Sequence, residues 1–136
     1  IIIVIDSTEV KQTFGFVQKN EEQQVQDNSH EGTQENRPLI KTILNYAQRN
    51  TIPVSIFLTK CDKLDGNVAE NIENLGKSEK IKSEINYVSQ RTGIPQIRIF
   101  PVVNYTDQPE ATSPMRLQIF NAFRAIIAEI ESSRTL

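Results

Sequence analysis

Short apolar runs alternate with longer amphipathic stretches along this chain. The runs cover residues 1–5, 53–59 and 97–103, and polar residues follow each of them. Runs this short, apolar on successive positions and rich in strand-forming residues, are typical of strands that are covered on both faces. Pro101 cannot donate a hydrogen bond to a sheet, so it predicts an edge strand or a strand end at the third run. The pattern therefore predicts three strands.

Three stretches place apolar residues three or four positions apart, which is the spacing of one face of a helix. They run from residue 38 to 50, from 78 to 91, and from 113 to the end of the chain. Gly93 stands where a left-handed residue commonly ends a helix, and Ser113 with Pro114 supplies an N-cap and a first-turn proline. The last helix carries the longest apolar stripe, which consists of Leu117, Phe120, Phe123, Ile127 and Ile130.

Strands that alternate with helices predict right-handed crossovers and a parallel sheet with helices on its faces. The expected fold class is α/β, a three-layer parallel sheet with flanking helices. A chain of 136 residues with 38% hydrophobic content can supply one modest core, so one domain, or part of one, is expected. Residues 19–36 are almost wholly polar, with Val25 as their only large apolar residue, and are predicted to form a mobile surface loop.

Charge and cysteine content exclude several classes of function. The net charge is −2, from 15 basic and 17 acidic residues that are well mixed, so no broad basic field attracts nucleic acid or anionic lipid. Cys61 is the only cysteine, which rules out an internal disulfide and favours a reducing, cytoplasmic location. Residues 1–5 are too few to cross a bilayer. Because the chain opens in mid-strand without Met, we expect it to be a fragment of a longer protein.

The second predicted strand leads into Thr59-Lys60-Cys61-Asp62, which matches the [Asn/Thr]-Lys-x-Asp motif of GTPases. Ligands of open parallel sheets bind beyond the carboxyl ends of the strands, where this tetrapeptide lies. The Asp62 carboxylate can accept two parallel hydrogen bonds from guanine, whereas adenine offers no matching pair of donors. Lys60 can lay its aliphatic stem along the ring. The alternative interpretation of both residues is a solvated loop after a strand.

Two other strand ends carry candidate residues. Asn104 and Tyr105 follow the third strand, where GTPases place a loop that flanks the base, although an ordinary strand-to-helix turn fits equally well. Asp6 follows the first strand and suits either a metal ligand or a cap, of which we favour the cap. His30 has no neighbouring Cys or second His. Gly76-Lys77-Ser78 resembles the end of a phosphate-binding loop, but position 71 is Asn where that loop requires Gly. No catalytic residue or metal ligand is predicted.

Longer stretches resemble the C-terminal half of the interferon-induced protein 44 family. They are residues 88–95 and 99–105, preceded in the same order by 3–7 and 58–62. The resemblance implies that residues 1–136 are part of a P-loop GTPase-like domain that binds GTP or GDP, with 19–36 as an insertion. It also implies a cytoplasmic location and a role in innate immune or antiviral response. The phosphate-binding loop, switch regions and Mg²⁺ ligands would lie upstream, so hydrolysis cannot be assigned to any residue here.

Two functions remain open at this point. The first is a guanine-nucleotide-binding domain in which Lys60 and Asp62 select the base. The second is a non-hydrolysing pseudo-GTPase that acts as a protein interaction module and binds protein partners through its helices. A three-stranded sheet without neighbours exposes an apolar edge, so we expect the isolated chain to be poorly soluble or to self-associate.

Overall fold

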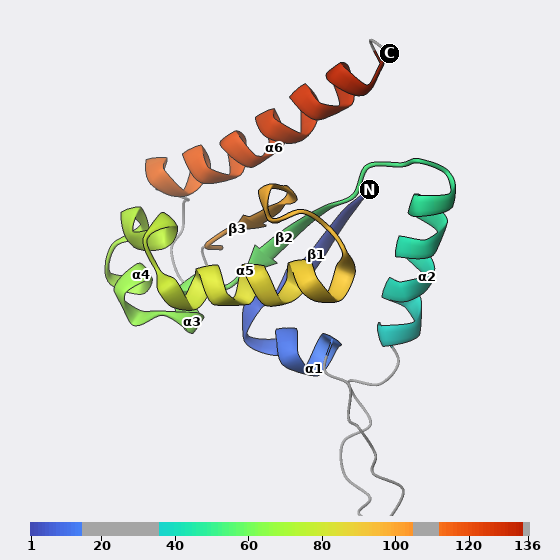
Figure 1. The fold of residues 1–136 in the computed structure, drawn as a ribbon. Helices are drawn as coiled ribbons and strands as arrows, with labels where there is room; N and C mark the ends of the chain where they lie inside the picture. The colour runs from blue at the N-terminus through green and yellow to red at the C-terminus, as the bar shows by residue number, and fades with distance from the viewer. Residues whose placement is uncertain (15–35, 105–111, 135–136) are drawn as a thin grey trace, which may run out of the picture.

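The computed structural model describes residues 1–14, 36–104 and 112–134. Within them one parallel sheet has the strand order β1-β2-β3 (Figure 1). In the register, Asp6 pairs with Thr59, and Ile56 pairs with Ile99. The predicted α/β class and parallel sheet are confirmed. The strands are β1 (Ile2–Asp6), β2 (Ser55–Thr59) and β3 (Ile99–Pro101).

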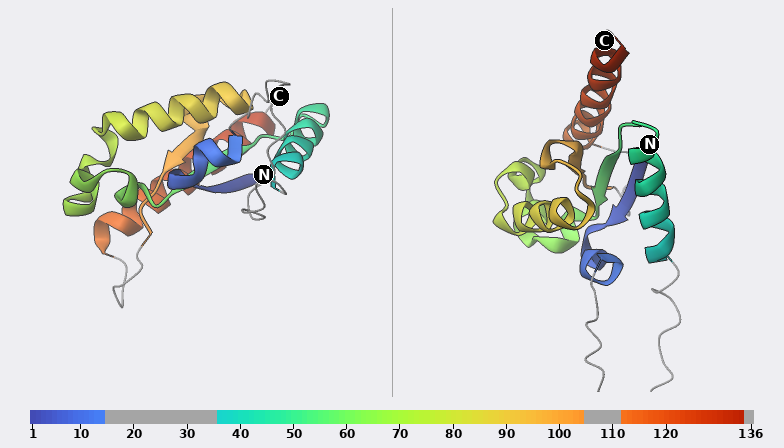
Figure 2. Two further views of the ribbon diagram at one scale, coloured as in Figure 1. Left: turned by 90° about the horizontal axis from the view of Figure 1, so that it is seen from below. Right: turned by 45° about the vertical axis from the view of Figure 1, so that its right-hand side comes forward.

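Helices cover both faces of the sheet, so the three layers are also confirmed. Figure 2 shows the sheet between α5 and α6. The short helices α3 and α4 follow β2, and single 3-10 turns follow β1, follow α4 and precede β3. The helices are α1 (Val10–Phe14), α2 (Asn36–Arg49), α3 (Cys61–Leu64), α4 (Gly66–Glu70), α5 (Glu79–Thr92) and α6 (Ser113–Arg134), and the 3-10 turns are η1 (Ser7–Glu9), η2 (Ile72–Gly76) and η3 (Gln96–Arg98).

The main core lies between the sheet and the layer of α1, α2 and α5. All five residues of β2 are buried, as expected for a central strand with helices on both sides. Ile56 and Leu58 of this strand are fully buried and pack with Ile81 and Val88 of α5. On the opposite face, Phe57 belongs to a smaller cluster with residues of β3 and α6. Side chains of β2 therefore alternate between two cores.

Helix α5 matches the predicted stretch 78–91 to within one residue at each end. Ser78 is its N-cap and accepts a hydrogen bond from the Ile81 backbone N–H at 3.3 Å. The same hydroxyl donates to Asp65 Oδ2 at 2.6 Å, while the other oxygen of Asp65 accepts from the Asn67 N–H. The hydrogen bond from Ser78 is the main cause that holds the pKa of Asp65 below its usual range. Gly93 ends the helix with a left-handed φ of 74°.

We expect Ser78→Ala to lower the free energy of unfolding by about 1–3 kcal/mol. The substitution removes the N-cap and leaves an oxygen of Asp65 without its donor. The loss is costly because both residues are buried. Denaturant titration followed by circular dichroism measures the change. The matched control is Ser83→Ala, because Ser83 is exposed on the same helix and should change stability by no more than about 0.5 kcal/mol. Equal effects of the two substitutions would contradict the capping role.

The third strand is shorter than the predicted range 97–103. Residues 96–98 instead form a 3-10 turn, closed by a hydrogen bond from the Arg98 N–H to the Pro95 carbonyl at 2.9 Å. Pro101 is the last residue of β3, and β3 is an edge strand, so both readings of this proline are confirmed. Val102 still donates to the Leu58 carbonyl at 2.8 Å, which carries the pairing one residue further.

Other boundaries differ from the predictions by a residue or two. Strand β1 includes Asp6, β2 begins at Ser55 rather than 53, and α2 begins at Asn36 rather than 38. Asn36 is therefore helical and not part of a loop. The remainder of the predicted loop at 19–35 lies outside the described residues, as do its Val25 and His30.

Helix α6 is present as predicted, but much of the surface of its apolar stripe stays exposed. Instead Ala122, Ile119 and Ile126 pack against Phe57 and the β3 region. Phe123 contacts the Phe57 ring edge-on, with 5.3 Å between the ring centroids, but Phe123 stays partly exposed. The five stripe residues retain 37–63% of their surface exposed, namely Leu117, Phe120, Phe123, Ile127 and Ile130.

Strand β1 also leaves apolar side chains exposed. Val4 is the register partner of Phe57, and its side chain is 65% exposed, while Ile2 lies two positions earlier on the same face and is 41% exposed. Because Phe57 also contacts Phe123, the two groups of apolar side chains are neighbours. We call the set of Ile2, Val4 and the five α6 stripe residues the β1–α6 face. It is the main uncovered apolar surface among the described elements.

Candidate functional site

The carboxyl ends of the strands bring together residues that lie far apart in the sequence. Asp6 at the end of β1 is the register partner of Thr59 at the end of β2, and Lys60 follows directly. Cys61 begins α3, which places Asp62 in the first turn of that helix. Asn104 follows β3 at the same edge of the sheet and is exposed. Tyr105 lies outside the described residues, so its predicted contact with the base is left as a prediction.

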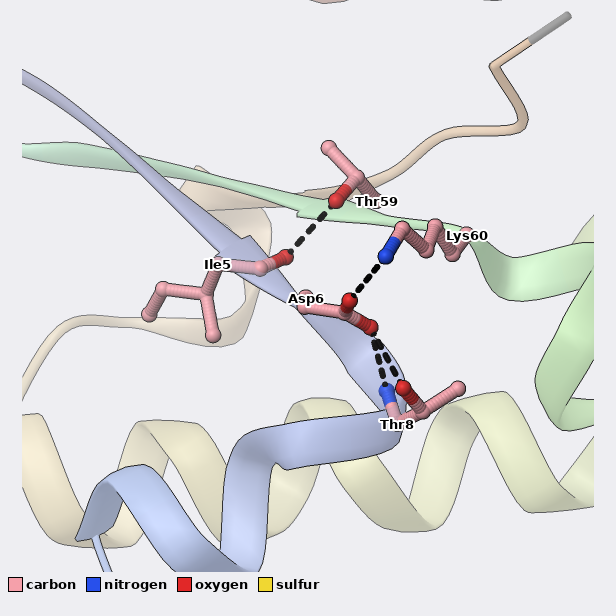
Figure 3. Close-up of polar contacts among 5 residues, drawn as sticks. All are labelled: Ile5, Asp6, Thr8, Thr59 and Lys60. Carbon is pink, nitrogen blue, oxygen red and sulfur yellow. Dashed lines mark hydrogen bonds and ion pairs between the residues drawn. The ribbon is translucent and has the colours of Figure 1, made fainter. Parts of the chain in front are cut away.

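Thr59 connects the first two strands. Its hydroxyl donates to the Ile5 carbonyl at 3.1 Å, and its side chain is buried (Figure 3). A residue held in this way fixes the position of the loop that follows. Thr59 therefore supports the motif from within the sheet, and its hydroxyl is already engaged by β1.

Lys60 adopts an uncommon backbone conformation. Its φ of 57° and ψ of 34° are left-handed, which is uncommon for a residue with a side chain. The side chain reaches from the end of β2 to the end of β1, where Nζ lies 2.5 Å from Asp6 Oδ2 (Figure 3). About half of its side-chain surface is exposed. The motif lysine is thus paired with an acid 54 residues away in sequence.

Asp6 caps the turn that follows β1, as the sequence analysis favours. Its Oδ1 accepts hydrogen bonds from the backbone N–H of Thr8 at 2.9 Å and from the Thr8 hydroxyl at 2.7 Å. It is the N-cap of η1. One carboxylate oxygen is thus fixed by Thr8, which leaves the other for Lys60.

The Asp6–Lys60 pair keeps both charges across neutral pH. Partial burial alone would raise the pKa of Asp6, but hydrogen bonds from Lys60 and Thr8 outweigh it and lower that pKa. The hydrogen bond to Asp6 raises the pKa of Lys60. The contribution of Asp6 to stability is present above its unfolded pKa of about 4 and is lost as pH falls through the folded value. The contribution of Lys60 is present below about pH 10 and is lost as pH rises through the folded value.

Asp62 has a carboxylate with few protein partners. Its side chain is 17% exposed, and its nearest cation is Lys63, with Nζ 4.0 Å from Oδ2. That distance is too long for a hydrogen bond. Neither oxygen accepts a hydrogen bond from the residues that the structure describes. A carboxylate can accept about four hydrogen bonds, so Asp62 retains the capacity to receive two parallel donors from a ligand.

Cys61 fills the core beneath the motif. It is fully buried, and its Sγ donates to the Leu58 carbonyl at 3.1 Å. Burial raises the pKa of this thiol to about 11. The variable position of the motif therefore has a packing role, and its thiol is neutral at physiological pH.

We expect Cys61 to resist alkylation in the folded chain. A pKa near 11 in place of about 9 lowers the thiolate fraction roughly a hundredfold at neutral pH, and burial blocks the reagent as well. The rate of reaction with iodoacetamide, measured by mass spectrometry in buffer and in denaturant, checks this. A native rate equal to the denatured rate would contradict the packing of Cys61.

Gln118 is a residue of this region that the sequence analysis does not identify. Its side-chain amide accepts from the Val103 N–H at 3.2 Å and donates to the Val103 carbonyl at 3.0 Å. This paired contact anchors the segment that leads from β3 to Asn104. The only signal in the sequence is a polar residue within an apolar helix face.

No metal centre accompanies the motif in the parts of the chain that are described. They contain no group of three or more His, Cys, Asp or Glu side chains that could hold a metal ion. A groove of about 470 Å³ lies between α2 and α5 at the opposite ends of the strands. It is lined by Leu44, Ile52 and Ile94 among others, and does not adjoin Asp62. The motif and the groove are therefore separate.

None of the described helices is long and apolar enough to cross a membrane.

Comparison with known proteins identifies no relative. No protein-family model matches the chain, and neither the curated proteins nor the solved structures include a match.

Proposed function

We propose that this chain is the base-binding half of a guanine-nucleotide-binding domain with a P-loop GTPase-like fold. The observation that carries the proposal is Asp62, a carboxylate with spare acceptor capacity in the motif that follows the central strand of a parallel sheet. Ligands of such sheets bind at the carboxyl ends of the strands. The proposal includes membership of the interferon-induced protein 44 family, a cytoplasmic location and a role in innate immune or antiviral response, on the basis of the resemblance in sequence.

The recognition step is a pair of hydrogen bonds. Guanine presents a ring N–H and an exocyclic amine side by side, and Asp62 can accept both with its two oxygens. By analogy with other bidentate base contacts, such a pair discriminates by about 1–3 kcal/mol. The stem of Lys60 supports the ring face, and Asn104 and Tyr105 flank the base.

Phosphate binding belongs to the upstream half of the same domain. That half would bind the phosphates of GTP or GDP together with Mg²⁺, which supplies charge stabilisation during phosphoryl transfer. The residues of the present chain select the base and hold its plane. They are not assigned any step of hydrolysis.

Displacement of a fluorescent GDP analogue from the full-length protein tests this proposal. We expect unlabelled GDP to displace the analogue at concentrations at least roughly fivefold lower than ADP, which is the low end of bidentate discrimination. Equal displacement by GDP and ADP would remove the role of Asp62 in base selection. No binding of the analogue at all would favour the second candidate function.

The second candidate is a pseudo-GTPase that acts as a protein interaction module. The β1–α6 face favours it, because extensive exposed apolar surface commonly marks a site of protein association. In a nucleotide-binding protein this face serves instead to pack against the upstream half of the domain. A full-length protein that binds no nucleotide, yet keeps the β1–α6 face exposed, would support the interaction module.

A further inference from the structure

We propose that Asp6 is a positioning residue for guanine binding, because it holds the Lys60 side chain across the carboxyl ends of β1 and β2. The proposal rests on the proposed function and adds to it a residue that makes no contact of its own with the base. Asp6 lies in another strand from the motif, and its side chain contacts the motif through Lys60 Nζ. Its effect on a nucleotide is therefore indirect.

The left-handed backbone of Lys60 indicates that contacts around it stabilise this conformation. Among the described residues other than glycine, only Thr51 and Lys60 have positive φ. Thr51 follows the end of α2, where left-handed residues commonly end helices. Lys60 instead follows a strand, where no such cap is needed. Uncommon backbone conformations of this kind persist only where surrounding contacts stabilise them.

The side-chain geometry shows what that conformation provides. Lys60 begins at the end of β2, and its ammonium ends at Asp6 on the neighbouring strand (Figure 3). The four-carbon stem therefore spans the distance between two paired strands, and the charge is neutralised at its far end. A long side chain fixed in this way loses less conformational entropy when a flat ring packs on its stem.

Asp6 is itself held so that it can act as a fixed anchor. Its other oxygen accepts two hydrogen bonds from Thr8, one from the backbone and one from the hydroxyl. The carboxylate therefore has two separable roles, as the cap of η1 and as the partner of Lys60. A test must distinguish the loss of one from the loss of the other.

Asp6→Asn in the full-length protein is the test, with the Kd for GDP as the readout. The amide keeps an oxygen for Thr8 but removes the negative charge that attracts Lys60. We expect the Kd to rise about tenfold, since charge-assisted hydrogen bonds are the stronger ones. Thr8→Val is the matched control, because it removes a hydrogen bond to the same carboxylate and leaves the Lys60 contact intact. It should leave the Kd unchanged within about twofold.

A double-mutant cycle separates positioning from a general structural role. If Asp6 acts only through Lys60, then Asp6→Asn should have no further effect on the Kd in a Lys60→Met background. Additive losses in the double variant, an unchanged Kd for Asp6→Asn, or an equal loss for Thr8→Val would each overturn the proposal. Failure of the wild-type protein to bind GDP would instead overturn the proposed function, so the two failures are distinguishable.

Discussion

Asp62→Asn is expected to change the base preference of the full-length protein from guanine to xanthine. An amide has one acceptor oxygen and two N–H donors, so Asn can no longer accept both hydrogen bonds from guanine. It can donate to the carbonyl that xanthine carries in place of the guanine amine. Loss of a bidentate contact worth about 1–3 kcal/mol corresponds to roughly a five- to 150-fold weaker affinity for GDP.

Calorimetric titration of wild type and Asp62→Asn with GDP, ADP and xanthosine diphosphate measures this change. Glu70→Gln is the matched control, because it removes the same charge from an exposed residue of the next helix and should leave all three affinities unaltered. A variant that still prefers GDP, with no gain for the xanthine nucleotide, would show that Asp62 does not read the base.

Replacing Phe120 and Ile127 together by Lys is expected to convert a self-associating chain into a monomer. Parallel strands are normally covered on both faces, yet the β1–α6 face of residues 1–136 is exposed. Two charges in the middle of this face make its burial against another copy unfavourable.

A control of matched composition is available on α2. Leu39→Lys with Tyr46→Lys removes two side chains that are 57% and 59% exposed, against 63% for Phe120 and 54% for Ile127. We expect sedimentation velocity over a range of concentrations to show association for wild type and for the α2 pair, and a monomer for the α6 pair. A wild-type chain that is monomeric and melts cooperatively would contradict the expectation, as would equal behaviour of the two pairs.

Patterns within one segment of the sequence predict the elements that those patterns define. The strand at 55–59 is found because its apolar residues are successive, and α5 because its apolar residues recur at helical spacing and Gly93 follows them. Helix α6 shows where the same reasoning stops. Periodicity identifies an amphipathic helix, but Ala122, and none of the larger stripe residues, is the residue of α6 that becomes buried. Which residues of α6 become buried depends on the elements that pack against the helix, and the spacing of residues within the helix does not encode those neighbours.

The candidate site divides in the same way. Lys60 and Asp62 are predictable because the motif is contiguous and follows a strand. The left-handed backbone of Lys60 and its contact with Asp6 arise only when β1 pairs with β2 in register. Gln118 joins the site through a helix that begins after β3. These contacts link residues far apart in the chain, so a reading of one segment at a time cannot find them.

Calorimetric titration of the wild-type full-length protein with GDP, inosine diphosphate and ADP tests the guanine-binding claim most directly. Hypoxanthine keeps the ring N–H of guanine but lacks the exocyclic amine, so it offers Asp62 one donor instead of two. The account predicts that affinity falls in the order GDP, inosine diphosphate, ADP. Equal affinity for GDP and ADP would contradict it.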